Sequence, residues 1–236
     1  MVHVPSATAP SRMLVASALA LLTLAGCGDL EQAAAAGNAR DDLAGDLATQ
    51  LGGSAALSYS ATYQLAGGKT GTISQAQNPT RSAYAYPGGK VIVTSEATTR
   101  CEPAGKTVTC TMTAPETPAG APSPGVFASA GKSGMAVPDT VLDLLNAASL
   151  DADKTVQQHD TTIAGHHATC VEVSGVDEAA TSAFTVCITT EGVLGSFTGT
   201  LDGTDMDVAM THYTDKIEAN AFELPGGAKL VDHRER

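Results

Sequence analysis

Much of the chain alternates between apolar and polar residues with a period of two, which is the pattern of β-strands buried on one face. The clearest example is the segment 57–65, whose apolar face consists of Leu57, Tyr59, Ala61, Tyr63 and Leu65. Further segments of this kind lie at 70–77, around 84–86, and at 90–101, 106–114, 156–163, 168–173, 183–190, 192–201 and 206–214. Because turn residues such as Gly, Pro and Asp-Gly separate them, these strands predict an antiparallel meander.

Two other segments repeat apolar residues every three or four positions, as an amphipathic helix does. In residues 39–51, Leu43, Leu47 and Leu51 recur at four-residue spacing, between an Asn N-cap and a Gly-Gly terminator. Residues 139–150 carry a second apolar face, which consists of Val141, Leu144, Leu145 and Ala148. Residues 114–138 are rich in Pro, Gly, Ala and Ser and predict a long irregular loop within the domain. The pattern predicts one α+β domain over residues 39–236, with a large antiparallel sheet.

The N-terminus has the pattern of an export signal. Arg12 precedes a stretch of twelve mostly apolar residues, 13–24, whereas a helix that spans a bilayer needs about 20. The stretch ends in Leu24-Ala25-Gly26-Cys27, which resembles the lipobox of bacterial lipoproteins. The resemblance implies that residues 1–26 are a cleaved signal peptide and that Cys27 carries palmitate-type acyl chains. It places the chain on the extracytoplasmic face of the cell membrane.

Residues 27–38 then form a lipidated tether, although their Ala-rich part is equally compatible with an extra turn of the first helix. Other interpretations of the N-terminus are an ordinary secretory signal and an uncleaved membrane anchor. Two or three acyl chains on one residue make a stable anchor, whereas a single chain binds only reversibly.

Four cysteines remain after Cys27, and an even number in an exported chain favours two disulfides. They are Cys101, Cys110, Cys170 and Cys187. The first two fall on apolar faces of their predicted strands, with Cys101 in phase with Val91 and Val93, and the last two fall on polar faces. Because cross-strand partners point the same way, we predict Cys101–Cys110 and Cys170–Cys187. The alternatives are free thiols or a metal site, and the absence of Cys-x-x-Cys spacing disfavours zinc.

The charge of the chain excludes one class of function. There are 13 Lys and Arg against 25 Asp and Glu, a formal charge of −12, and no cluster of basic residues. Nucleic-acid binding needs a basic surface that neutralises phosphates, so it is excluded. The same charge predicts a folded domain that is not attracted to anionic lipids. Aromatic residues make up 4% of the chain, so the core is expected to rest on aliphatic side chains and Met.

The lipobox, the long meander, the intervening helices and the ending Phe222–Ala228, of the type Phe-x-x-Pro-x-x-Ala, together resemble actinobacterial lipoproteins of the LppX/LprG type. That family shares a half-barrel fold with the LolA and LolB carriers. The resemblance implies a large curved antiparallel sheet with helices packed on its concave face and lipid acyl chains held between them. The long loop and the few large apolar residues depart from a well-defined carrier.

Applied to this sequence, the predicted acyl-binding cavity is lined by apolar positions of the strands and the second helix. These are Leu57, Tyr59, Tyr63, Val141, Leu144, Leu145, Phe184, Val186, Ile188, Phe197, Met206, Val208 and Met210. Met supplies an adaptable apolar lining. The same residue types also form an ordinary filled core, so the alternative is a tethered interaction or sensory lipoprotein with no small-molecule ligand. Its protein partner is unknown.

The sequence contains only weak matches to known catalytic motifs. Ser129-Ala130-Gly131-Lys132 and Lys69-Thr70-Gly71 match two motifs of penicillin-binding proteins, but their order is reversed and Ser-Asp-Asn is missing. Ser129 is also expected to lie in the irregular loop. No Gly-x-Ser-x-Gly is present. A hydrolase is therefore the third and weakest hypothesis, and no enzyme activity is expected.

Metal and cofactor sites are not expected either. The candidate ligands are His159, His166, His167 and His212, together with Asp202, Asp205 and Asp207. We interpret the histidines as solvated residues of turns, and the aspartates do not follow the calcium-loop pattern. We therefore expect no cofactor.

Overall fold

The computed structural model describes residues 43–115, 124–176 and 179–234, all of which belong to the compact unit Gly37–Arg236. The predicted signal peptide, Cys27, the tether and the first residues of the predicted first helix lie outside the described residues. None of the helices in the described ranges has the length and hydropathy of a membrane span.

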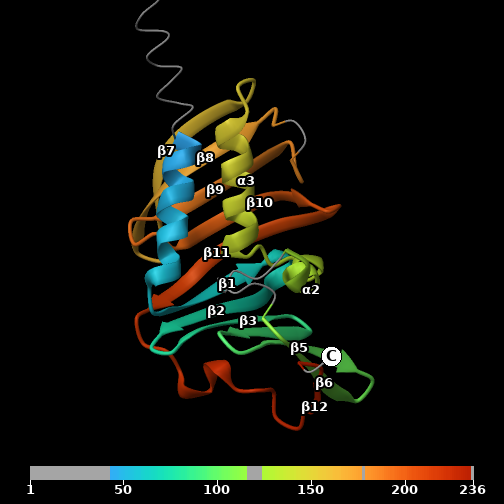
Figure 1. The fold of residues 1–236 in the computed structure, drawn as a ribbon. Helices are drawn as coiled ribbons and strands as arrows, with labels where there is room; N and C mark the ends of the chain where they lie inside the picture. Colours follow the sequence, from blue (N-terminus) through green and yellow to red (C-terminus); the bar gives the residue numbers. More distant parts are fainter. Residues whose placement is uncertain (1–42, 116–123, 177–178, 235–236) are drawn as a thin grey trace, which may run out of the picture. The chain divides into compact units, whose positions relative to one another are not determined.

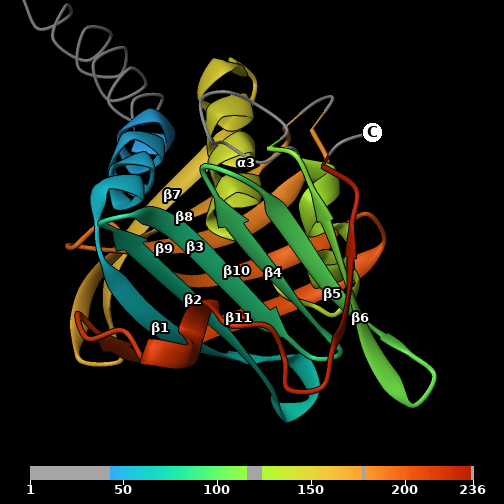
Figure 2. The ribbon, with the colours of Figure 1, turned by 60° about the horizontal axis from the view of Figure 1, so that its bottom comes forward.

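The described strands form one sheet of twelve, in the order β12-β6-β5-β4-β3-β2-β1-β11-β10-β9-β8-β7 (Figures 1 and 2). Neighbouring strands are antiparallel, except that β12 runs parallel to β6. The strands are β1 (Tyr59–Leu65), β2 (Lys69–Gln77), β3 (Thr80–Tyr86), β4 (Gly89–Thr94), β5 (Thr98–Ala104), β6 (Thr107–Thr113), β7 (Thr155–Ile163), β8 (His166–Ser174), β9 (Ala183–Thr189), β10 (Leu194–Leu201), β11 (Thr204–Thr214) and β12 (Lys229–Asp232).

Three helices within the described ranges accompany the sheet: residues 43–53, α2 (Ala128–Lys132) and α3 (Pro138–Leu150). Short 3₁₀ turns lie at η1 (Ser54–Ala56), η2 (Ala66–Gly68), η3 (Pro124–Phe127) and η4 (Ala219–Phe222). The helix 43–53 and α3 lie on the same face of the sheet (Figure 1). We call this the inner face and the opposite one the outer face. The predicted α+β class, with one large antiparallel sheet and helices on one face, is confirmed.

The helix 43–53 and α3 run antiparallel and meet through small residues. A Cβ at Gly45 would lie 3.8 Å from Cβ of Ser149, and a Cβ at Gly52 would lie 3.9 Å from a methyl group of Leu142. Contacts that pair an early residue of one helix with a late residue of the other require opposite directions. The small residues therefore let the two backbones approach closely while their apolar faces cover the sheet.

Helix α3 begins and buries residues as its sequence predicts. Pro138 occupies the first turn, where its missing N–H costs nothing, and Asp139 follows it at the positive end of the helix. Its buried side chains are Val141, Leu144, Leu145 and Ala148. The predicted apolar face is thus the face that packs against the sheet.

The predicted strand 90–101 is wrong, because β4 and β5 are separate strands joined by a turn. Thr94 forms this turn by accepting backbone N–H groups of Glu96 and Ala97 with its Oγ1. The turn changes the phase of the side chains, so Arg100 and not Cys101 lies opposite Val91. Cys101 lies opposite Lys90 and projects from the outer face.

The predicted irregular loop 114–138 is also wrong in part. Residues 124–132 form η3 and α2, and residues 116–123 lie outside the described ranges. Val126, Phe127 and Ala130 are buried, and the Phe127 ring packs edge-on against Tyr84 at 4.7 Å. Burial of these side chains stabilises a short helix that the Pro- and Gly-rich composition conceals. Ser129 therefore lies on α2 and not in a loop, and its hydroxyl donates to the Glu102 carboxylate.

The C-terminal segment crosses the outer face of the sheet and then supplies β12, which the sequence pattern did not predict (Figure 2). The Arg81 guanidinium lies 4.1 Å from the centre of the Phe222 ring. Lys90 Nζ donates to the Glu223 carbonyl oxygen at 2.7 Å. These contacts bring β12 alongside β6, where it covers that edge of the sheet.

Candidate functional site

The predicted lining residues meet in one apolar layer between the inner face and the helices. Leu57 is partly buried against this layer, and each of the other twelve is at most 4% exposed. The layer also contains residues of β2, β3 and β4 that the sequence analysis did not include, namely Ile73, Tyr84, Tyr86, Val91 and Val93. Their alternation along β3 and β4 was the signal that could have revealed them. We call this set of residues the interior layer.

The interior layer is filled by its own side chains. Phe184 and Phe197 stack with ring centres 6.0 Å apart, and Tyr59 stacks on Tyr213 at 5.9 Å. A Cβ placed at Gly71 would lie only 3.0 Å from Sδ of Met135. At these places the side chains already touch, so an acyl chain would enter there only if side chains or helices moved.

Tyrosine hydroxyls bring hydrogen bonds into this layer. Tyr63 donates to the Leu194 carbonyl oxygen at 2.9 Å, and Tyr84 contacts Asp139 Oδ2 at 3.4 Å. Burial raises the pKa of both tyrosines well above its ordinary value, so they stay neutral donors. Burial also raises the pKa of Asp139, against the opposing effect of the hydrogen bond from Tyr84. The first turn of α3 is therefore attached to β3 by a partly buried polar contact.

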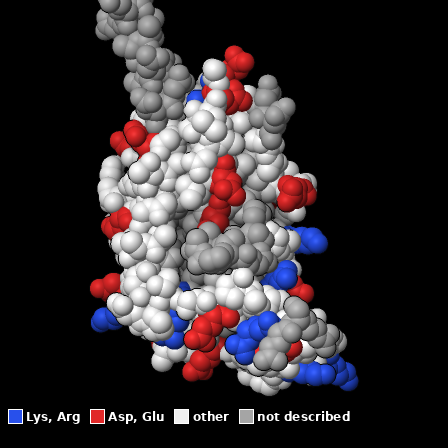
Figure 3. Space-filling model, in the orientation of Figure 1, with Lys and Arg blue, Asp and Glu red and all other residues white. Residues whose placement is uncertain are grey.

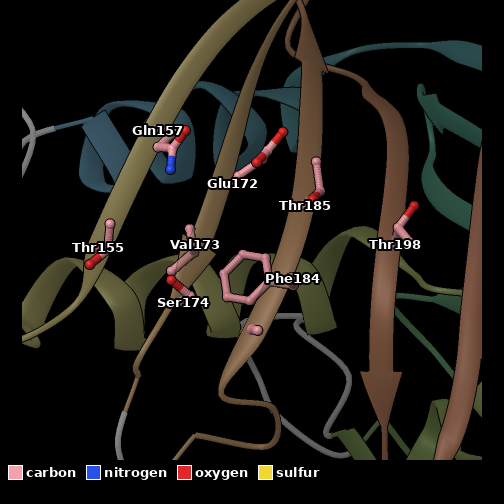
Figure 4. Close-up of a pocket in the computed structure, with 9 residues that line it drawn as sticks. Thr155, Gln157, Glu172, Val173, Ser174, Phe184, Thr185 and Thr198 are labelled. Atoms are coloured by element: carbon pink, nitrogen blue, oxygen red, sulfur yellow. The ribbon is translucent and has the colours of Figure 1, made fainter.

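One of two described pockets lies at the ends of β7–β10 and has a volume of about 310 Å³. Its lining is mainly polar: Thr155, Gln157, Glu172, Val173, Ser174, Ala183, Phe184, Thr185 and Thr198. Gln157, Glu172, Thr185 and Thr198 form a row across the four strands (Figure 4). Only Phe184 belongs to the predicted lining, so this pocket is not the expected acyl cavity.

The other pocket has a similar volume, about 310 Å³, and lies over β4, β5 and β6. We call it the outer apolar pocket. Its lining consists of Ala85, Gly88, Gly89, Lys90, Cys101, Pro103, Val108 and Pro225. Lys90 and Cys101 project from the outer face, and Pro225 comes from the C-terminal segment that crosses it. No predicted lining residue contributes to this pocket.

Two disulfides join the cysteines in the predicted pairs, Cys101–Cys110 and Cys170–Cys187. Each pair occupies directly opposed positions of neighbouring antiparallel strands. Both pairs lie on the outer face, and the second packs with Ala168 and Ile163 in a small cluster of its own. Two disulfides are typical of proteins that fold outside the reducing cytosol.

One group of potential metal ligands forms around the second disulfide. Ligand atoms of His159, Cys170 and Cys187 lie within 4.8 Å of one another. The two sulfurs are bonded to each other, so they do not offer the thiolates that a metal would need.

The remaining histidines and aspartates with described contacts stabilise turns and strands at the surface. His166 Nδ1 lies 2.8 Å from Glu191 Oε1, and its ring meets Tyr213 edge-on at 4.9 Å. Asp205 accepts a hydrogen bond from Thr200 at 2.7 Å. Each of these contacts joins neighbouring turns or strands.

No protein-family model matches the chain. No curated protein matches it either. Among solved structures, MucB is 13% identical with a TM-score of 0.49, and the match covers 80% of this chain and 65% of MucB. MucB in complex with MucA(peri) is 10% identical with a TM-score of 0.43, covering 80% of this chain and 61% of that one. An uncharacterized conserved protein from Thermus thermophilus is 10% identical with a TM-score of 0.46, covering 80% of this chain and 99% of that one. The matched part is less than two thirds of the length of MucB.

Proposed function

We propose that this chain is an exported lipoprotein that is anchored through Cys27 to the extracytoplasmic face of the membrane. Its folded domain binds lipid acyl chains in the interior layer. The lipobox-like segment Leu24–Cys27 supports the anchor. The two disulfides support a location outside the cytosol.

The observation that carries the proposed ligand is the continuity of the interior layer. Apolar side chains from strands in both halves of the sheet and from α3 form a single buried cluster on the inner face. Met135, Met206 and Met210 belong to it, and their unbranched side chains adapt to new neighbours at low cost. Acyl chains are themselves apolar, so a bound chain would replace side-chain contacts without burying a polar group.

Binding requires the helices to move away from the sheet, because the interior layer is filled. Asp139 and Tyr84 hold the first turn of α3, and Gln50 Nε2 donates to the Thr189 carbonyl at 2.9 Å near the end of the helix 43–53. These two contacts restrain the helices at their ends. Opening would break one or both of them and expose the apolar faces to the entering chain.

The test uses mature protein with Cys27→Ser, so that no covalent lipid is present. We expect fatty acids or phospholipids in organic extracts of the purified protein, and uptake of a dansylated fatty acid after delipidation. Leu145→Trp should abolish uptake by overfilling the interior layer, whereas Leu150→Trp on the same helix should not, since Leu150 is 87% exposed. Circular dichroism would verify that both variants fold.

The second candidate is a tethered interaction module with a filled core. The low exposure of the predicted lining residues favours it. It predicts no extracted lipid and no uptake of the fatty acid by the unmodified domain. That result would reject the lipid-binding proposal and leave the anchored interaction module.

A further inference from the structure

The described charges are divided unequally between two parts of the chain. Residues 69–134 and 216–234 supply β2–β6 and β12, and their described part holds nine Lys and Arg against five Asp and Glu. Residues 139–215 supply α3 and β7–β11, and their described part holds only Lys154 against eleven Asp and Glu. In Figure 3, Lys and Arg gather toward the end of the molecule where β5 and β6 lie. The chain therefore contains a region of net positive charge, although its formal charge is −12.

The outer apolar pocket lies in this basic region. Lys90 lines it directly, Lys106 lies in the turn between β5 and β6, and Lys229 begins β12 opposite Thr109 of β6. Lys106 and Lys229 are exposed. Glu223 is the carboxylate beside Lys90, and it partly offsets the effect by which burial lowers the pKa of Lys90. Lys90 and Lys106 thus lie at an apolar hollow, whereas Lys229, opposite Thr109, projects from the inner face.

Exposed leucines extend the apolar surface beside the pocket. Among the described residues, the large hydrophobic side chains that are clearly exposed are Leu150, Leu224 and Leu230. Leu224 precedes the pocket residue Pro225, and Leu230 pairs with Cys110, whose disulfide partner Cys101 lines the pocket. Leu224 is 36% exposed and Leu230 is 45% exposed. Apolar side chains that remain in water next to an apolar pocket are typical of an interaction site.

We propose that this end of the sheet lies against the membrane, and that the outer apolar pocket takes part of an acyl chain of an anionic phospholipid. Lys90 and Lys106 bind its phosphate, while Leu224 and Leu230 enter the interface. An anionic leaflet attracts basic segments, and an apolar pocket beside the cations distinguishes a lipid from a free phosphate ion. The proposal is opposite to the expectation based on the net charge, because a membrane interacts with the charges on the surface that faces it and not with the total charge of the chain.

The proposal rests on the anchoring part of the proposed function, which holds the domain close to a bilayer. Sixteen peptide units separate Cys27 from Leu43, the first described residue. A chain of that length reaches at most about 55 Å when extended. For about 200 residues the expected radius of gyration is about 16 Å, so this reach is enough for any side of the domain to meet the membrane.

The first test is sedimentation of mature Cys27→Ser protein with vesicles. We expect binding to phosphatidylcholine vesicles that contain 30% phosphatidylglycerol, no binding to pure phosphatidylcholine, and a marked loss in 0.5 M NaCl. Lys106→Glu should weaken binding about tenfold. Lys69→Glu makes the same change of charge away from the pocket and should have a much smaller effect. Equal effects of the two substitutions would overturn the proposed site.

The second test uses the absence of Trp from the chain. A single Trp at Leu224→Trp should be quenched by brominated phosphatidylglycerol, whereas a single Trp at Leu150→Trp should not. Quenching at 150 but not at 224 would place another surface on the membrane and overturn the proposal.

Acyl-chain binding in the interior layer and membrane binding at the outer apolar pocket can be tested independently of each other. Leu145→Trp should lose fatty-acid uptake and keep vesicle binding, whereas Lys106→Glu should keep uptake and weaken vesicle binding. Loss of both activities in both variants would reject the assignment of two distinct sites.

Discussion

At the scale of single residues, Asp139 is a carboxyl group that is partly buried beside the interior layer. It lies in the first turn of α3 next to the buried hydroxyl of Tyr84, with Asp143 one turn further along the helix. Burial raises its pKa because the charged carboxylate loses contact with water, and Asp143 acts in the same direction. The helix N-terminus and the Tyr84 hydrogen bond favour the charged form but do not reverse the shift.

This shift predicts a pH dependence of stability. Because the folded protein holds the Asp139 proton more tightly than the unfolded chain, its free energy of unfolding should fall as the pH rises from about 4, the ordinary Asp value, through the raised pKa. Asp139→Asn should remove this contribution and flatten the dependence. Urea denaturation at several pH values between 3.5 and 7 measures it.

Asp143→Asn is the matched control, since it removes one exposed carboxylate from the same helix. It should leave most of the slope in place. Equal slopes for wild type and Asp139→Asn would contradict the assignment of this dependence to Asp139.

At the scale of elements, the helix 43–53 is held against the turn between β9 and β10. Gly192 lies in this turn with φ of 87°, and a Cβ there would lie 2.7 Å from the Gln50 carbonyl oxygen. The backbone conformation and the close approach both require glycine. The contact joins the end of a helix near the start of the domain to a turn far along the sequence.

Gly192→Ala should therefore destabilise the domain by about 3 kcal/mol, from left-handed backbone strain and from the displaced helix. Gly203→Ala is the matched control, since Gly203 also has a positive φ, 74°, but no atom within 4 Å of its added Cβ. It should cost only about 1 kcal/mol. Chemical denaturation of both variants measures the difference, and equal losses would show that the close approach adds nothing.

The strands that alternate clearly were predictable from sequence, and they include β1, β2, β7, β8, β9 and β11. The elements that were missed depend on contacts distant in sequence. β12 has only four residues and forms because Arg81 and Lys90 hold the preceding segment. The helix α2 exists because Phe127 packs on Tyr84.

The same limit applies to the candidate site. The apolar positions of β1, α3 and β9–β11 were recognised from the sequence, whereas those of β2–β4 were left out, although alternation along β3 and β4 offered a signal. Strand parity still identified the disulfide partners, although Cys101 lies on the face opposite Val91. The pairing is still correct because Cys110, which is in phase with Val108, lies on the same outer face as Cys101. The outer apolar pocket involves Pro225, so no local pattern points to it.

At the scale of the whole molecule, the proposed anchor has a direct test. Full-length chain should incorporate radiolabelled palmitate and remain in the membrane fraction after a 0.5 M NaCl wash, which removes purely electrostatic attachment. Cys27→Ala should abolish labelling and release the protein. Thr23→Ala changes the same segment but keeps Leu24–Cys27 and should behave as wild type. A Cys27→Ala protein that stays labelled and bound would contradict the anchor.

The pairing of β12 with β6 also governs the order in which the molecule is completed. Among the described residues, the strand that covers this edge is the last in the sequence, so β6 is synthesised long before the strand that pairs with it. During synthesis β6 therefore stays uncovered until residues 229–232 are available. Truncated products, and fusions that displace the C-terminus, would keep a bare strand edge and be prone to associate with one another.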